Sequence, residues 1–338
     1  SNGWAADQRL FFAMEFSEDI SNISLYDSTS VVNGTEWKAL KMKAVLDFKT
    51  KTKNVIMVKV GLSPVSYDNA LANIKAEIPH WDFTKSVQQA DAKWNKALEK
   101  IDIKGDADTK TIFYTSFYHT MFAPSIFNDA NGDYRGSDKK VYKNAGFVNY
   151  TTFSLWDTYR AAHPLYTLTD ENVADYANSM LAIQQQQGTM PVWHLAGNET
   201  GTMVGYHSIP VVVDAYLKGF KISEDKVWDA IKGFKDYNDL GLRDNRNQDY
   251  ISAEKEPWSV AKGLEYAIDS YSIAKFAQKT DKTEAYQTYL SDSKNYKNYF
   301  DQRVGFMRGK LSDGTWRADF NPYKSIHMED DYVEGNAW

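Results

Sequence analysis

The chain has 338 residues, of which 43% are hydrophobic and 25% are charged, with a formal net charge of −6. This composition is ordinary for a soluble globular protein, the length favours two domains, and the acidic balance excludes nucleic acid as a partner. Cysteine is absent, which excludes disulfides and thiolate sites, and no apolar run is long enough for a membrane span.

The first part of the chain has the pattern of β-strands. Apolar or alternating runs at 10–16, 37–48 and 55–62 predict three strands, and Asn33-Gly34 and the Lys/Thr tract at 49–54 predict turns. Three strands are too few for a closed sandwich. We therefore expect this segment to be the tail of a larger β-domain.

Helical periodicity then replaces the strand pattern. Ser66 is expected to cap a helix that ends before Pro79, and a second amphipathic helix is predicted at 82–100. Nearly all of the chain after Gly105 is predicted to be helical, except for a hairpin turning at Asp313-Gly314. Further helices are predicted at 111–122, 156–166, 171–187, 200–219, 224–238, 259–279 and 283–301.

Three stretches combine tryptophan, carboxylate and other polar side chains as a sugar pocket requires. In the first, Asp157, Arg160 and His163 recur at three-residue steps and so share one helix face, where Asp157 and Arg160 can pair with each other or both contact a ligand. The others are 190–203 and 331–338, each with a Gly-Asn pair. Indole rings stack on the C–H faces of pyranoses, while carboxylates and amides bind the hydroxyls.

These motifs resemble glycoside hydrolase family 92, the calcium-dependent exo-acting α-mannosidases. The resemblance rests on Ser154-Leu-Trp-Asp-Thr-Tyr-Arg160, on Gly197-Asn-Glu-Thr200 with Met203 and His207, and on Glu334-Gly-Asn-Ala-Trp338. Motifs match in order from about Phe12 to the last residue, and the family's pattern continues past Trp338.

The resemblance implies a mainly α fold with an N-terminal β segment. Residues 1–65 are expected to be the C-terminal part of a β-sandwich domain, 66–105 a linker of two helices, and 106–338 the N-terminal part of an (α/α)6-barrel catalytic domain. Such a barrel needs twelve helices, and about seven are predicted after Gly105. We therefore expect the chain to be cut at both ends.

The resemblance also assigns a catalytic residue. Inverting hydrolysis needs an acid that protonates the leaving oxygen and a base that activates water across the ring. Glu334 matches the family's general acid, and Tyr332, Val333 and Trp338 are expected to desolvate it and raise its pKa. The alternative is a glutamate that caps a helix. The family's bases belong to a later motif that has no counterpart in this sequence.

The substrate-binding residues follow from the same motifs. Asp157 matches a residue that binds the terminal mannose, with Arg160 as its expected structural partner. Glu199 is predicted either to line the pocket or to cap a helix that begins near Thr200. The predicted substrate-binding residues are Trp156, Asp157, Trp193, His194, Asn198 and Glu199.

Metal binding is expected only by resemblance. The six histidines show no metal-ligand spacing, and His207 is expected to be a satisfied core residue. The family's Ca²⁺ orients the mannose hydroxyls, and we expect its oxygen ligands to lie mostly beyond Trp338. The metal-ligating residues of this chain therefore stay unassigned.

The motifs favour an exo-acting, inverting α-mannosidase of α-1,2-mannosidase type that trims mannose-containing glycans. Ser1-Asn2-Gly3 resembles the remnant of a removed tag, so a leader is expected to have been lost. The family resemblance implies a periplasmic or surface location in a bacterium. The alternatives are another toroid carbohydrate enzyme, such as a glucoamylase-like hydrolase or a lyase, and a non-catalytic glycan-binding fragment. The oligomeric state stays open.

We predict that the 338-residue chain alone has no measurable mannosidase activity with added calcium, and that it either elutes as an oligomer or needs a complementary fragment to stay soluble. Without the base, water is not activated, and the uncovered helix faces and strand edges favour association. Turnover of a manno-oligosaccharide and mass by light scattering, measured on one sample, test both halves. A monodisperse, active monomer would contradict the prediction.

Overall fold

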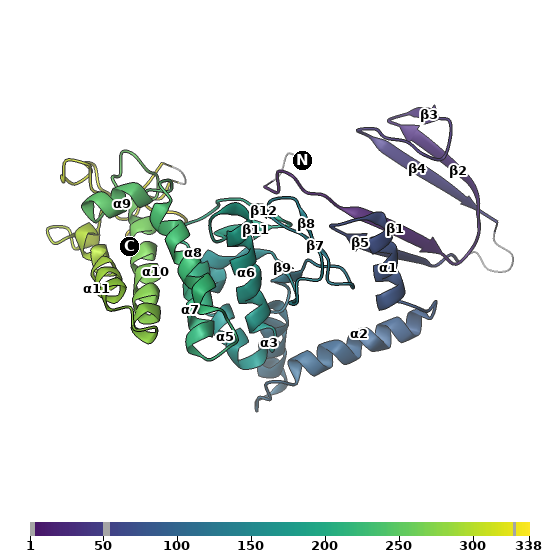
Figure 1. The fold of residues 1–338 in the computed structure, drawn as a ribbon, viewed down its shortest axis with the longest axis horizontal. Coiled ribbons are helices and arrows are strands. Elements are labelled where there is room, and N and C mark those ends of the chain that lie inside the picture. The colour runs from purple at the N-terminus through teal and green to yellow at the C-terminus, as the bar shows by residue number, and fades with distance from the viewer. Residues whose placement is uncertain (1–3, 50–54, 327–328) are drawn as a thin grey trace. The chain divides into compact units, whose positions relative to one another are not determined.

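The computed structural model describes residues 4–49, 55–326 and 329–338 (Figure 1). The chain divides into two compact units. The β unit consists of Arg9–Ala97 with Asp129–Asn131, and the helical unit consists of Ser1–Gln8, Leu98–Asn128 and Gly132–Trp338. This division places the two linker helices in the β unit, whereas the predicted boundaries lie after residues 65 and 105.

The β unit contains two small antiparallel sheets. One pairs β1 with β5, in a register that sets Phe11 opposite Ser63, and the other has the order β3-β2-β4. The strands are β1 (Phe11–Phe16), β2 (Ile20–Asp27), β3 (Ser30–Val32), β4 (Met42–Phe48) and β5 (Val58–Ser63). The three predicted strands are confirmed with shorter bounds, and β2 and β3 are additional.

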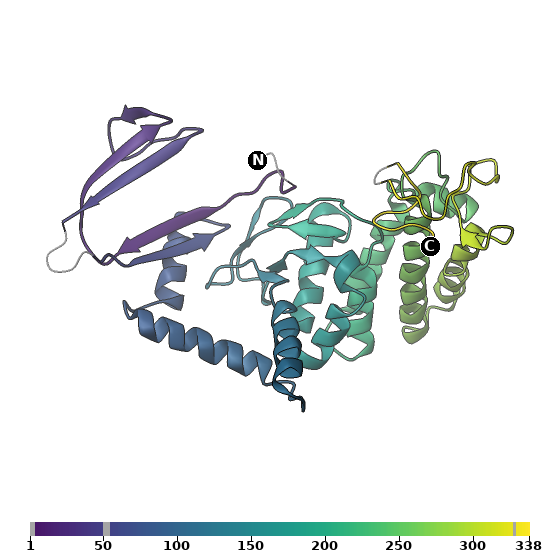
Figure 2. The same cartoon turned by 180° about the vertical axis from the view of Figure 1, so that it is seen from behind.

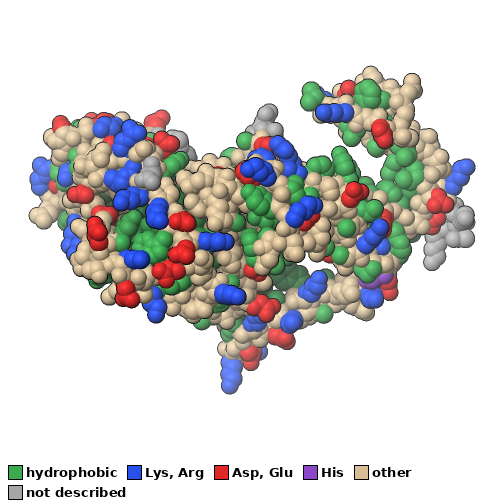
Figure 3. All heavy atoms as spheres, viewed as in Figure 1, with side chains coloured by type: hydrophobic (Ala, Val, Ile, Leu, Met, Phe, Trp, Pro, Cys, Tyr) green, Lys and Arg blue, Asp and Glu red, His purple; other side chains and the backbone are tan. Residues whose placement is uncertain are grey.

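Turn predictions in the β unit have different outcomes. Asn33-Gly34 follows β3, and Gly34 has a positive φ of 107°, as a turn residue should. The predicted turn at 49–54 falls largely outside the described residues, as does Ser1-Asn2-Gly3. The open faces of this unit carry apolar side chains, including Phe12, Val60 and Leu62, each at least half exposed (Figure 3).

A glycine lets the first helix lie directly on the sheet. Helix α1 (Tyr67–Glu77) begins at Ser66, whose hydroxyl accepts a hydrogen bond from the Asn69 N–H, which confirms the predicted cap. Alternate residues of β5 are buried against α1, and Gly61 is one of them. A Cβ atom at Gly61 would clash with the carbonyl of Ala70 and the side chain of Ile74.

One buried carboxylate ties a distant loop to this packing. Asp129 accepts hydrogen bonds from Ser63 Oγ at 2.8 Å, Asn69 Nδ2 at 2.7 Å and Asn73 Nδ2 at 2.8 Å. Three donors from the β5–α1 corner therefore neutralise the cost of burying Asp129. The second linker helix, α2 (Phe83–Leu98), buries none of its side chains.

Helices of 4 to 21 residues are the main regular elements of the helical unit (Figures 1 and 2). They are α3 (Ala107–His119), α4 (Leu155–Thr158), α5 (Ala162–Thr169), α6 (Val173–Gln187), α7 (Ser208–Leu217), α8 (Glu224–Asp236), α9 (Leu242–Gln248), α10 (Ser259–Lys279), α11 (Thr283–Asp292) and the 3₁₀ turn η1 (Asn295–Tyr299). Short strands connect them: β6 (Ser125–Ile126), β7 (Tyr134–Arg135), β8 (Val141–Tyr142), β9 (Tyr150–Thr151), β10 (Phe153–Ser154), β11 (Trp193–Leu195), β12 (Asn198–Glu199), β13 (Phe300–Asp301) and β14 (Phe306–Met307).

The long helices pack against one another around α7 and α10. Helix α7 lies against α5, α6, α8 and α10, and α10 lies against α7 and α11. Their buried faces form one apolar core, to which Met180, Ile209 and Phe276 contribute fully buried side chains. A β segment followed by two linker helices and packed helix layers confirms the predicted fold class. No helix among the described residues is long and apolar enough to cross a bilayer.

The helix predicted at 283–301 is too long, because α11 ends at Asp292 and the 3₁₀ turn η1 and strand β13 follow it. Two other predicted helices are interrupted for local reasons. The helix predicted at 156–166 is divided into α4 and α5, because Pro164 lacks an N–H and is tolerated only in the first turn of a helix. The helix predicted from residue 200 begins only at Ser208, since Gly201 and Gly205 both have positive φ. The turn predicted at Asp313-Gly314 is confirmed by the bond from Leu311 N–H to the Thr315 carbonyl.

We predict that Gly61→Ala destabilises the β unit by about 1–3 kcal/mol or more, because the added methyl group forces α1 off the sheet. The control is Val60→Ala, since Val60 is the next residue of β5 and lies half exposed on the opposite face. Urea unfolding followed by circular dichroism would measure both. Equal midpoints for the two variants would show that α1 does not need the glycine.

Candidate functional site

Short strands bring the first two motifs together in the helical unit. Strand β10 pairs with β11 so that Ser154 lies opposite Trp193, and β11 pairs with β12 so that His194 lies opposite Glu199. The resulting three-stranded sheet has the order β10-β11-β12. The segment that begins at Ser154 therefore starts beside the 193–199 hairpin.

The third motif is anchored at the start of α10. The Asp330 carbonyl accepts a hydrogen bond from Trp258 N–H at 2.8 Å, and the Asp331 carbonyl accepts one from Val260 N–H at 3.1 Å. The Asp331 carboxylate also accepts the Ser259 hydroxyl at 3.0 Å. These bonds satisfy amide groups that a helix leaves free in its first turn.

A small apolar cluster completes the junction of the three motifs. Val333 is buried together with Val204 and Trp258, and Trp156 and Met203 pack against them. Each of the three motifs, or the segment directly beside it, thus contributes to one cluster at the beginning of α10. The structure brings together what is dispersed over 180 residues of sequence.

A carboxylate on α10 receives three donors from the first motif. Glu265 accepts a hydrogen bond from Trp156 Nε1 at 3.0 Å, from the Tyr159 hydroxyl at 2.6 Å and from Arg160 Nη2 at 2.5 Å. Burial alone would raise the pKa of Glu265, but His207 and these donors outweigh it and lower the pKa to about 2. Glu265 is therefore ionised at neutral pH.

A buried histidine extends this network along the helix. His207 Nδ1 lies 2.7 Å from Asp269 Oδ1, and its Nε2 lies 3.2 Å from Glu265 Oε2 as an ion pair rather than an aligned hydrogen bond. The imidazole stacks on Tyr159 with the ring centroids 3.8 Å apart. Burial would lower the pKa of His207, but the two carboxylates outweigh it and raise the pKa to about 9.

The expected partnership of Asp157 with Arg160 is wrong, because Arg160 pairs with Glu265. Asp157 instead accepts the Ser154 hydroxyl at 2.5 Å, and it is exposed to solvent. Trp156, beside it, is half-buried. His207 is buried as expected, but it is a charged, ion-paired residue rather than an ordinary member of the core.

Two residues of the second motif are engaged within the protein itself. Glu199 accepts the N–H groups of Val192, Trp193 and Gly201 at 2.8–3.0 Å, and so closes the loop around the hairpin. It does not cap a helix, because none begins near Thr200. Asn198 is buried, and it accepts Lys139 Nζ and the Asp7 N–H and donates to two carbonyls. Its predicted contact with sugar finds no support in this geometry.

His194 and Trp193 lie in different environments. His194 is buried between the hydroxyls of Thr151 and Ser137, at 3.2 and 3.1 Å, and burial lowers its pKa to about 3. It is therefore a neutral structural residue at pH 7. Trp193 is half-buried and makes an edge contact with Trp4, with ring centroids 6.0 Å apart.

The predicted general acid lies on the surface. Glu334 is exposed, and Trp338 is 79% exposed and packs near Phe306 and Tyr323. The expected desolvation of Glu334 by Trp338 is thus absent from this structure. Only Val333, of the three residues expected to cover the carboxylate, is buried.

Comparison with known proteins identifies the fold that carries these motifs. The model of the glycosyl hydrolase family 92 catalytic domain matches residues 69–338. The chain belongs to glycosyl hydrolase family 92. Among curated proteins, none matches the chain significantly.

Solved structures agree with this family 92 assignment. The GH92 α-mannosidase BT3965 from Bacteroides thetaiotaomicron shares 35% identity with a TM-score of 0.93, over 99% of this chain and 46% of that one. The inverting mannosidase BT2199 from the same organism shares 26% identity with a TM-score of 0.88, over 100% of this chain and 47% of that one. The chain thus spans less than half the length of these relatives.

The sequence reasoning missed the two carboxylates on which the family 92 motifs converge. Glu265 and Asp269 are the only acidic residues of α10, and they lie one helical turn apart. Two carboxylates at i and i+4 within a predicted helix of largely apolar and small residues were the available signal. Such a pair on a buried face requires cations from elsewhere in the chain, and Arg160 and His207 provide them.

The described residues do not form a calcium site. No group of three or more acidic or histidine side chains converges among them as metal ligands. Glu265 and Asp269 are already neutralised by Arg160 and His207, so a divalent ion has no set of free carboxylates here. No catalytic step is therefore derived through calcium.

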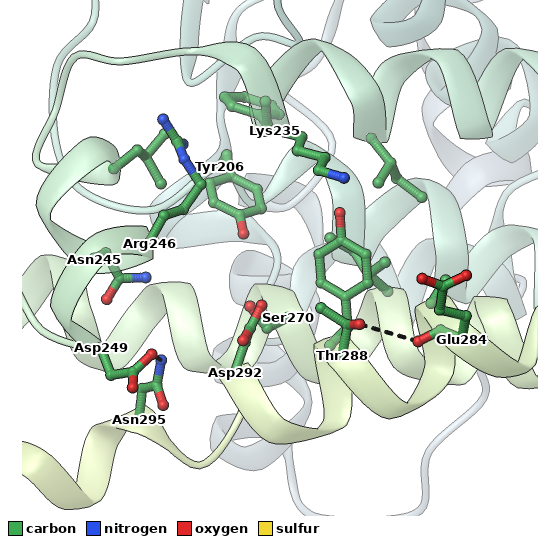
Figure 4. Close-up of a pocket in the computed structure, with 16 residues that line it drawn as sticks. Tyr206, Lys235, Asn245, Arg246, Asp249, Ser270, Glu284, Thr288, Asp292 and Asn295 are labelled. Carbon is green, nitrogen blue, oxygen red and sulfur yellow. Dashed lines mark hydrogen bonds between the residues drawn. The ribbon is translucent and has the colours of Figure 1, made fainter.

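One cavity in the described part of the helical unit lies away from the motifs. It has a volume of about 520 Å³, and Figure 4 shows its lining side chains pointing in from α8, α9, α10 and α11. Tyr206 is the only lining residue next to a motif position. Burial and the nearby Asp249 raise the pKa of Asp292 in this cavity. None of the predicted site residues lines it.

We predict that the protein becomes less stable in alkali, because His207 loses its proton there. Because its pKa is raised from 6.5 to about 9, its contribution is complete below pH 6.5 and is lost as the pH rises through 9. The loss is on the order of 3 kcal/mol. Unfolding midpoints at pH 7 and pH 10 should differ less for His207→Gln than for the parent protein.

His163 provides the control, since burial lowers its pKa to about 3 and it stays neutral over this range. His163→Gln should lower stability equally at pH 7 and pH 10. If His207→Gln keeps the full pH dependence of the parent protein, His207 is not the titrating group.

Proposed function

We propose that the protein containing this chain is an exo-acting, inverting α-mannosidase that removes mannose from glycans, with a preference for α-1,2 linkages. The observation that carries the proposal is the convergence of Trp156 and of the segment before Glu334 on the start of α10, in a chain that belongs to family 92. The solved relatives support it, since one is an inverting mannosidase and the structure of another contains mannoimidazole.

The proposed roles follow from the positions of the side chains. The indole ring of the half-buried Trp156 is held by its hydrogen bond to Glu265, and part of the ring stays open to solvent. The carboxylate of the exposed Asp157 accepts one hydrogen bond from Ser154 and can accept others from sugar hydroxyls. Such a pair would hold a terminal mannose by its C–H face and its hydroxyls. Trp193 is kept as a more distant substrate contact, on the neighbouring strand.

Glu334 is proposed as the general acid. Glu334 directly follows the segment 331–333, which is hydrogen-bonded to and packed against the start of α10. The backbone near Glu334 is therefore held in place, while its side chain is exposed to solvent. An inverting reaction would place its partner base roughly 6.5–9.5 Å away, across the bound sugar. Residues outside the motifs of this chain must provide that base. Calcium, with ligands outside the described residues, and a periplasmic or surface location stay part of the proposal.

The test is Glu334→Gln in the complete protein that contains this chain. We expect hydrolysis of a mannobiose to slow by about 10²–10⁴-fold, because the leaving oxygen is no longer protonated. Hydrolysis of a dinitrophenyl mannoside should change much less, since that leaving group departs without a proton. Steady-state kcat on both substrates measures the difference.

The matched control is Glu329→Gln, another exposed glutamate of the same segment. Equal losses on the two substrates would remove Glu334 from the role of acid. Binding of manno-oligosaccharides without any turnover by the parent protein would instead favour a glycan-binding function.

A further inference from the structure

We propose that Glu265 is a positioning residue of the sugar site: by binding the side chains of Trp156, Tyr159 and Arg160 together, it sets the position of Trp156 and of its neighbour Asp157. The proposal rests on the proposed function, because it concerns the same sugar site. It assigns a role to a residue outside the three motifs.

The segment that carries Trp156 cannot hold its own conformation. Helix α4 has four residues and lacks a side-chain cap, and so short a helix is unstable without tertiary contacts. Its neighbour α10 has 21 residues, and Glu265 lies in its buried first half. The long helix therefore provides the rigid support from which Glu265 reaches the short one.

Glu265 accepts more hydrogen bonds than an ion pair with Arg160 requires. Arg160 alone would neutralise Glu265, yet the carboxylate also takes the indole N–H of Trp156 and the hydroxyl of Tyr159. The bond on the indole edge restrains the rotation of the ring, and the ring also packs against the apolar cluster of Val204, Trp258 and Val333. Trp156 thus has a defined orientation while it remains partly open to solvent.

Asp269 provides a matched comparison within the same helix. Both carboxylates are buried on α10 and both contact His207, so removing either charge disturbs the same ion network. Asp269 otherwise accepts the backbone N–H of Tyr206, at 2.9 Å, and no contact with Trp156 is recorded for it among the described residues. Of the two carboxylates, only Glu265 accepts hydrogen bonds from side chains of the first motif among the described residues.

The experiment is a double-variant cycle in the complete protein, with kcat/KM for a mannobiose as the readout. Trp156→Phe removes the indole N–H and should cost about tenfold, and Glu265→Gln should cost about 10²-fold through misplacement of the site. Because Glu265 acts through Trp156, the double variant should lose about 10²-fold rather than the roughly 10³-fold expected for independent sites.

The same cycle with Asp269→Asn is the control. Its thermal destabilisation should be comparable to that of Glu265→Gln, while its effect on kcat/KM multiplies with that of Trp156→Phe. If Glu265→Gln does not fold, Glu265→Asp replaces it, since the charge is kept but the carboxylate is one methylene further from its donors. If the parent enzyme is active and the losses in kcat/KM from Glu265→Gln and Trp156→Phe multiply in the double variant, the positioning role of Glu265 is wrong. The proposed function would not be affected by that result.

Calorimetric titration with methyl α-mannoside separates this outcome from failure of the proposed function. A parent protein that binds the sugar without turnover refutes the hydrolase assignment, and the cycle is then measured on Kd. A parent protein that neither binds nor hydrolyses mannosides overturns both proposals.

Discussion

Two negative charges buried on one helix determine the organisation of the helical unit around the candidate site. A buried carboxylate without a partner is too costly to remain ionised. Glu265 and Asp269 therefore need cations brought to them, and Arg160 and His207 come from two distant parts of the chain. Burial raises the pKa of Asp269, and the charge and hydrogen bond of the adjacent His207 work against that rise.

This charge balance has a geometric result. Arg160 follows the short helix α4, and His207 immediately precedes α7, so the network joins both segments to α10. The stacking of His207 on Tyr159 closes the contact between the first two. The loops that carry the family motifs are thus held by electrostatics at one point, whereas the apolar core is formed by residues of α5, α6, α7, α8 and α10.

Local signals in the sequence were sufficient for most of the long helices and for the strands β1, β4 and β5, whereas the short strands between residues 125 and 199, in a region predicted to be almost wholly helical, were missed. The Ser66 cap, the apolar strand runs and the long amphipathic helices follow from short-range patterns that the structure repeats. The eight-residue strand β2 and short elements such as β3 and α9 were not predicted, because their existence depends on pairing or packing with residues distant in sequence. The break before Pro164 could have been predicted from the sequence, since proline is tolerated only in the first turn of a helix, but one continuous helix was predicted at 156–166.

The site was less accessible to sequence reasoning than the fold. The motifs identify which segments matter, but not which atoms in them are already engaged. Asn198 and His194 have the residue types of a sugar pocket, yet their polar atoms are bonded within the protein. Arg160 was paired with its nearest acid in sequence, whereas its partner lies 105 residues away. Hydrogen-bond saturation and long-range charge pairing are properties of the three-dimensional arrangement.

The attachment of the first residues has a thermodynamic consequence for the β unit. Residues before Arg9 belong to the helical unit, where Asp7 N–H donates to Asn198 and Trp4 contacts Trp193, and the chain returns to that unit at Leu98. The segment 9–97 is therefore a loop closed at both ends by a folded body. Such closure lowers the entropy of the segment's unfolded state, as a crosslink does. The Asn198 amide thus contributes to the stability of a unit in which it does not lie.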